Sequence, residues 1–256
     1  MNESNNLVSP HRLSPSLRRV IVRSFRDAWD YLGLVLAASV FTALLPTMLA
    51  VAFYFLAGKP LWILVIVTFI IALLKGPILA GVFNLMHKVA YGGDPELSNL
   101  LVGFRESLRA SVLLIVLDVF LMLCLAADAV FFFGILGPMK PNLPGLVLGC
   151  LFVYLLVVWF CATGYQFPAL SAQKPLGQRV GVLAAVYKSL LAALSAPLYT
   201  LGVWLIVLVI VLICFLSAFG VFLLLGGMTA LIFTHALKEI YLCCGVISEP
   251  SDNENT

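Results

Sequence analysis

Charged residues are scarce in this sequence. Only 11% of its 256 residues are Asp, Glu, Lys or Arg, whereas 62% are hydrophobic. A soluble globular domain has roughly a quarter of its residues charged, so a water-soluble fold of this size could not bury so much apolar surface. The net charge of +3 is also small, which argues against a nucleic-acid partner. The solvent of this chain is therefore predicted to be the lipid bilayer.

The residue patterns of catalysis and metal binding are absent as well. The three histidines are scattered, and no Ser-His-Asp grouping, HExxH, P-loop or dinucleotide-binding pattern occurs. The six cysteines form no CxxC or Cys/His spacing, and four lie inside apolar runs, which is typical of small core residues. We therefore expect no enzyme, no cofactor and no bound metal. Cys243 and Cys244 follow the last apolar run, and their modification by acyl chains stays open.

Long apolar runs, in contrast, are abundant. Each is roughly 20 residues or longer, the length that a helix needs to cross the hydrocarbon core. The fold class is therefore predicted to be all-α: a polytopic membrane helix bundle with six transmembrane helices plus amphipathic interfacial helices on the cytoplasmic side. The predicted spans are 32–57, 61–86, 111–136, 145–168, 197–217 and 221–242.

Lys and Arg residues alternate from one side of these spans to the other. The N-terminal segment and the second and fourth connections are rich in them, whereas the first and third connections hold only Lys59 and Lys140. With Lys238, which marks the last exit, twelve basic residues lie on one side and two on the other. By the positive-inside rule both termini are predicted to be cytoplasmic.

Three segments are expected along the chain. Residues 1–30 form a cytoplasmic N-terminal segment with an amphipathic helix, residues 31–245 form the six-span domain, and residues 246–256 form an acidic disordered tail. Residues 98–110 and 176–194 also have an amphipathic helical pattern. A membrane-surface anchor is the favoured role of these three helices, ahead of a basic patch that recruits a partner.

The N-terminal helix is predicted in more detail. Ser14-Pro15 is a start signal, because Pro is favoured at the first helical position. Arginines occupy one face, and two ion pairs at i,i+4 spacing are expected, Arg23–Asp27 and Arg26–Asp30. The apolar stripe of the other face is predicted to consist of Leu17, Val20, Ile21, Phe25 and Trp29.

Ionisable side chains inside the predicted spans are the default functional candidates. At 1.5 Å per residue, Lys75 lies roughly 21 Å into the inward-running second span. Asp118 lies about 10 Å above the cytoplasmic edge of the third span, so the two depths nearly coincide in a core of about 30 Å. His235 falls at a similar level. The candidate intramembrane polar site is therefore Lys75, Asp118 and His235, whereas Asp128 lies near the outer edge and is assigned no role.

A helix kink is predicted at Gly76 and Pro77, beside Lys75, because proline removes a backbone donor. A charge beside a helix break is typical of transporter binding sites. Two interpretations stay open: a structural ion pair of Lys75 and Asp118 at a kink, and a polar site in the inner half of the bundle.

Four segments together resemble a known family. They read GPILAGVF at 76–83, LVGFR at 101–105, YQFPA at 165–169 and APLYT at 196–200. This combination is similar to the YesL-type family of bacterial integral membrane proteins, a family of unknown function. The resemblance implies a six-helix, multi-pass protein of the bacterial inner (plasma) membrane, with some relatives found near sugar-uptake systems.

Two functions are consistent with these observations. The first is a non-enzymatic accessory or structural component linked to a transport system, with the lipid bilayer and a membrane transport complex as partners. The alternative is a small permease that uses the inner-leaflet polar site around Lys75, Asp118 and His235. The sequence does not determine the oligomeric state.

Overall fold

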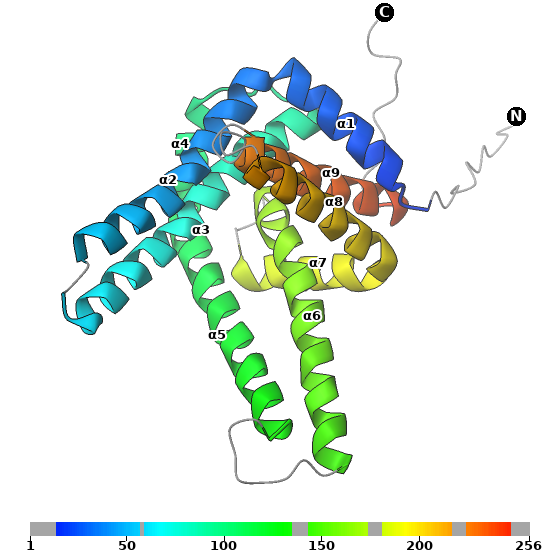
Figure 1. The fold of residues 1–256 in the computed structure, drawn as a ribbon. Coiled ribbons are helices and arrows are strands. Elements are labelled where there is room, and N and C mark those ends of the chain that lie inside the picture. The colour runs from blue at the N-terminus through cyan, green and yellow to red at the C-terminus, as the bar shows by residue number, and fades with distance from the viewer. Residues whose placement is uncertain (1–13, 57–58, 135–142, 174–180, 217–223, 247–256) are drawn as a thin grey trace, which may run out of the picture.

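The chain folds into helices joined by short connections (Figure 1). The computed structural model describes residues 14–56, 59–134, 143–173, 181–216 and 224–246, and every regular element in these ranges is a helix. Most of the predicted C-terminal tail lies outside these ranges. The helices are α1 (Leu17–Asp30), α2 (Leu32–Leu56), α3 (Leu61–Tyr91), α4 (Ser98–Glu106), α5 (Leu108–Phe132), α6 (Leu143–Ser171), α7 (Val182–Ser195), α8 (Pro197–Leu216) and α9 (Gly226–Cys243).

Five of the described helices are long and apolar enough to cross a membrane, namely α2, α3, α5, α6 and α8. This confirms the all-α membrane helix bundle and a multi-pass protein. The segment predicted as the sixth span, 221–242, forms α9 over its described part, and α9 is not one of the five. The reason is that His235, Lys238 and Glu239 lower the hydropathy of its C-terminal half.

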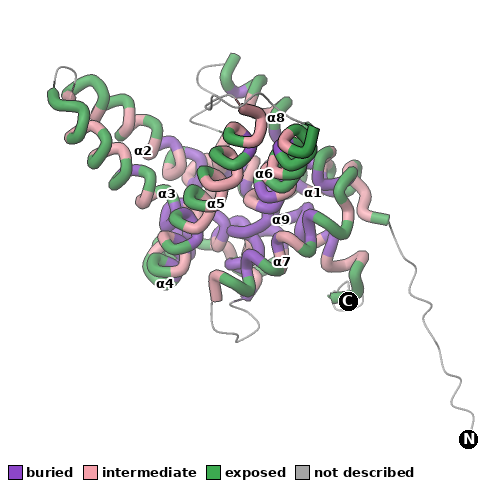
Figure 2. The backbone as a smooth tube through the Cα atoms, turned by 90° about the horizontal axis from the view of Figure 1, so that it is seen from below, coloured by how far each residue is buried: buried purple, intermediate pink, exposed green. Residues whose placement is uncertain are grey.

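Helix α9 lies at the centre of the fold. Twelve of its 18 residues are buried, and it contacts α1, α2, α3, α6 and α8. Buried residues gather around it, in the C-terminal halves of α3 and α6 and the N-terminal half of α2 (Figure 2). The α2/α3 and α5/α6 hairpins project away from this centre (Figure 1). Protein packing therefore buries the half that is predicted to be cytoplasmic, and the half predicted to be outer exposes apolar side chains that suit lipid.

Small residues let the helix backbones approach closely. A Cβ atom on Gly76 of α3 would lie 2.6 Å from the backbone oxygen of Ser111 on α5, which is closer than real Cβ contacts. A Cβ atom on Gly227 of α9 would lie 2.4 Å from the backbone oxygen of Val35 on α2. Such close approach through glycine is typical of packed membrane helices. At the predicted kink, α3 continues as a helix through Gly76 and Pro77, and both residues are buried.

All three predicted amphipathic helices are present. Helix α4 is shorter than the predicted 98–110, because the chain turns at Ser107 before α5 begins. Helix α7 begins at Val182, and residues 176–180 of the prediction lie outside the described part. Most of its small residues, such as Ala185 and Ala192, are buried, whereas large apolar ones such as Leu183 and Tyr187 are exposed. An exposed apolar face beside the spans suits the membrane interface.

The buried face of α1 differs from the predicted stripe. It consists of Val20, Ser24 and Ala28, whereas Phe25 and Trp29 are exposed, Trp29 at 78%. The prediction assigned these two aromatic residues to the face of Val20, but contacts with α9 turn them outward. Aromatic side chains left on an outer face suit the headgroup layer of a membrane.

Candidate functional site

A cavity of about 590 Å³ opens among α3, α5, α6, α8 and α9. Ligand pockets in proteins have volumes of roughly 300–1,000 Å³, so this one could hold a small molecule. Two of the predicted site residues, Lys75 on α3 and Asp118 on α5, line it. Most other lining residues are apolar, and five are aromatic: Phe83, Phe160, Phe167, Trp204 and Phe233.

The contact between α3 and α5 brings Lys75 and Asp118 into one cavity. Gly76, which follows Lys75, packs against the backbone of Ser111. Asp118 lies seven residues, or two helical turns, after Ser111, so both occupy the same face of α5. Lys75 is exposed along the cavity and Asp118 is half-buried. The two opposite charges attract each other electrostatically.

A buried amide on α6 holds the carboxylate of Asp118. Nε2 of Gln166 donates a hydrogen bond of 2.8 Å to Oδ1 of Asp118. Gln166 is 0% exposed, and its Oε1 has no hydrogen-bond partner among the described residues. Nε1 of Trp159, two turns earlier on α6, is also buried and lies close to the carboxylate of Asp118. Gln166 does not itself line the cavity, so its role is to orient the carboxylate that does.

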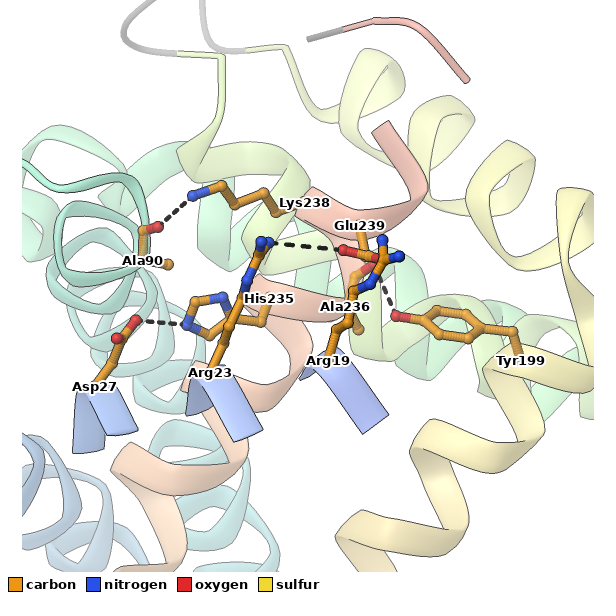
Figure 3. A network of polar contacts seen from close by, with 9 residues as sticks. All are labelled: Arg19, Arg23, Asp27, Ala90, Tyr199, His235, Ala236, Lys238 and Glu239. Atoms are coloured by element: carbon orange, nitrogen blue, oxygen red, sulfur yellow. Dashed lines mark hydrogen bonds and ion pairs between the residues drawn. The ribbon is translucent and has the colours of Figure 1, made fainter. Parts of the chain in front are cut away.

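His235 lies apart from this cavity. Its Nε2 is 2.8 Å from Oδ2 of Asp27 on α1, and its side chain is 4% exposed (Figure 3). Phe233, two residues earlier, faces the cavity instead. The structure therefore brings together Lys75 and Asp118 of the predicted site, and it directs His235 toward the N-terminal helix.

Charged residues of α1 and α9 form a second polar cluster, which we call the α1–α9 clamp: Arg19, Arg23, Asp27, His235 and Glu239 (Figure 3). Oε1 of Glu239 is 3.4 Å from Arg19, and Oε2 is 3.8 Å from Arg23. Of the two expected pairs within α1, Arg26–Asp30 is present at 4.0 Å. The clamp attaches α1 to the central helix through a carboxylate that is only 3% exposed.

Contacts of α9 with two spans complete this network. Nζ of Lys238 donates a hydrogen bond of 2.6 Å to the backbone oxygen of Ala90 on α3 and lies 4.7 Å from the ring centre of Tyr91. The hydroxyl of Tyr199 on α8 donates a hydrogen bond of 3.4 Å to the backbone oxygen of Ala236 (Figure 3). Helix α9 is therefore fixed from three sides, by α1, α3 and α8.

Sequence reasoning missed Glu239 and Gln166. A signal for Glu239 exists, because Arg19, Arg23 and Asp27 recur every four residues, and so do His235 and Glu239. Such spacing places each set on one helix face with complementary charges. Gln166 gives a weaker signal, a single amide inside an apolar run.

The cavity supplies groups that bind a molecule: an ammonium, a carboxylate and aromatic walls. Among the described residues, no three His, Cys, Asp or Glu side chains come together as a metal site would require. The chain matches no protein-family model, no curated protein and no solved structure.

Proposed function

We propose that this protein is a small permease, and that its ligand occupies the cavity of Lys75 and Asp118 as it crosses the membrane. The single observation behind the proposal is that Lys75 and Asp118, two charged residues of different spans, line one cavity. A charge in a span is costly, by roughly 3 kcal/mol or more, so two charges beside a cavity favour a binding role. A purely structural ion pair would need no cavity beside it.

A second candidate is an accessory component of a transport system without enzymatic activity. It is supported by the exposed apolar faces of α2, α3 and α7, which could contact another membrane protein. The resemblance to the YesL-type family agrees with both candidates and supports a bacterial inner-membrane location. An accessory protein should co-purify with its partner from native membranes, whereas a lone permease should not.

Transport is tested in liposomes that contain the purified full chain. Uptake of labelled amino acids, sugars and amines is measured, together with proton flux from an enclosed pH dye. We expect uptake of at least one probe by the wild type and its abolition by Asp118→Asn, because the variant loses a cavity charge but keeps its shape. Asp128→Asn is the matched control, since Asp128 does not line the cavity. Absence of wild-type flux for the whole panel, or equal flux in Asp118→Asn, would reject the permease.

The proposed topology has both termini in the cytoplasm. In a cysteine-free background, Lys59→Cys is expected to react with a membrane-impermeant maleimide in intact cells. Arg105→Cys is expected to react only after permeabilisation, because it lies on the basic side of the spans. Both positions are exposed in the structure, so a lack of labelling reports the membrane barrier and not burial. The opposite labelling pattern would invert the topology.

A further inference from the structure

We infer that the molecule held in this cavity is a zwitterion: an ammonium and an acidic group on an apolar body. This inference deepens the proposed function and relies on it for the location of the site. It adds the chemical class of the ligand and the orientation in which it binds.

The charges of the cavity sum to zero. Lys75 contributes the positive charge and Asp118 the negative one, and no other Lys, Arg, Asp or Glu lines it. A ligand with a single charge would neutralise one of these groups and leave the other without a ligand partner in a medium of low dielectric constant. A ligand with both charges pairs with both groups. Zwitterions therefore fit the cavity better than simple cations or anions.

The positions of the two charges set the orientation. Gln166 donates to Oδ1 of Asp118 and does not itself line the cavity. An ammonium has three donors and no acceptor, so it pairs with the carboxylate of Asp118. The acidic group then lies toward Lys75 on α3. The ligand is thus expected to span the cavity from α5 to α3.

The rest of the cavity wall favours a ligand whose body is apolar. Phe160 and Trp204 have ring centres 4.4 Å apart, and Trp204 and Phe233 have theirs 5.1 Å apart, so the aromatic surface continues from α6 through α8 to α9. The indole of Trp204 is held by a 3.2 Å hydrogen bond to the backbone oxygen of Cys161 on α6. Aromatic faces attract both apolar groups and ammonium groups.

The threonines of the wall offer few donors to a ligand. The hydroxyl of Thr163 donates to the backbone oxygen of Phe160 at 2.7 Å, and that of Thr229 donates to the oxygen of Leu225 at 2.6 Å. Both hydroxyl protons are therefore used within their own helices. A polyhydroxy compound such as a sugar would find too few partners here, because a buried hydroxyl needs a hydrogen bond.

A zwitterionic ligand of this kind has two sources. One is a free apolar amino acid from the aqueous side, and the other is the headgroup of an amine-bearing phospholipid from the bilayer. Leucine represents the first, with 3-methylbutylamine and 4-methylpentanoate as isosteres that keep only the amine or only the acid. Nanodiscs of phosphatidylglycerol with and without phosphatidylethanolamine test the second, with lipid retention after extraction read by native mass spectrometry.

Binding to the purified full chain is measured by equilibrium dialysis and by tryptophan fluorescence, to which Trp204 of the cavity wall contributes. We expect leucine to bind at least about tenfold more tightly than either single-charge isostere, because two charged contacts are made in place of one. For a lipid ligand, phosphatidylethanolamine is expected to be retained in preference to phosphatidylglycerol by a similar factor. Lys75→Gln and Asp118→Asn should each remove this preference, and Asp128→Asn should not. The double exchange Lys75→Asp with Asp118→Lys keeps both charges in the cavity and should restore part of the preference for the zwitterion.

The two proposals fail in different ways. Equal binding of zwitterions and single-charge isosteres, or a preference that survives Asp118→Asn, overturns the zwitterion. Wild-type transport of a sugar or a simple amine without zwitterion binding also overturns it, and leaves the permease intact. Zwitterion binding without any flux rejects the permease and supports the assigned ligand.

Discussion

Replacing both Arg19 and Arg23 with alanine is expected to lower the free energy of unfolding by about 3 kcal/mol. The double variant leaves Glu239 without its two ion-pair partners at a position that is 3% exposed. Removing one side of a buried ion pair costs roughly 3–5 kcal/mol, because the remaining charge is desolvated and unpaired. We expect the lower end, since the arginine side chains are 45% and 42% exposed. Denaturation in detergent, followed by circular dichroism, measures the loss.

Adding Glu239→Gln to the double variant separates the effect of the unpaired charge from the effect of the lost arginine side-chain packing. The triple variant is expected to regain most of the lost stability, because no charge then remains buried. Arg26→Ala is the matched control: its side chain is 81% exposed, and an exposed pair contributes only about 0–1 kcal/mol. A triple variant less stable than the double variant would contradict the role of the buried charge.

The membrane spans could be predicted from the sequence because hydrophobic length is a local property. Each of the five spans needs only its own residues to show that it can cross the hydrocarbon core. The segment of α9 is also predicted as a span, but hydrophobic length does not show that protein surrounds this helix in place of lipid. Its polar residues are tolerated through partners such as Arg19, which lies 220 positions away in the chain. The sequence shows that these polar residues would be costly inside a membrane, but it does not show which residues pair with them.

Depth along the membrane normal grouped three residues, and two of them, Lys75 and Asp118, line the cavity. The predicted directions and bounds of the spans gave Lys75 and Asp118 similar depths in the membrane, and the structure has both in one cavity. Height does not give rotation about the helix axis, however. His235 and Phe233 differ by two residues, or about 200° of rotation, so Phe233 faces the cavity while His235 faces Asp27. Grouping His235 with the cavity residues required an orientation that only the packing of α1 and α9 determines.

Gln166 shows a different limit. Its segment contributed to the family resemblance, yet nothing in the local pattern distinguishes an amide that orients a carboxylate from one that faces a connection. Its role depends on Asp118, 48 positions earlier, and on the contact of α5 with α6. Polar residues in spans are informative in pairs, and pairing is a property of the tertiary structure.

Replacing Gly227 with alanine is expected to lower the free energy of unfolding by about 3 kcal/mol. The new Cβ atom would lie 2.4 Å from the backbone oxygen of Val35, and a backbone cannot rotate away as a side chain can. Overpacking typically costs about 1–3 kcal/mol. Separating α2 from α9 would also stretch the 2.8 Å hydrogen bond from the amide of Gly227 to Oγ of Ser39, a contact of about 1 kcal/mol.

Gly33→Ala provides the matched control, because the same change on α2 meets no atom within 4 Å. Alanine is a better helix former than glycine by about 1 kcal/mol, so this variant should be as stable as the wild type or slightly more stable. Both variants are compared by denaturation in detergent, with retention of the monodisperse fold checked by gel filtration. Equal effects of Gly227→Ala and Gly33→Ala would show that α2 can move away from α9 at no cost. A large difference would show that the central position of α9, and with it the cavity wall that it provides, depends on a backbone contact that only glycine permits.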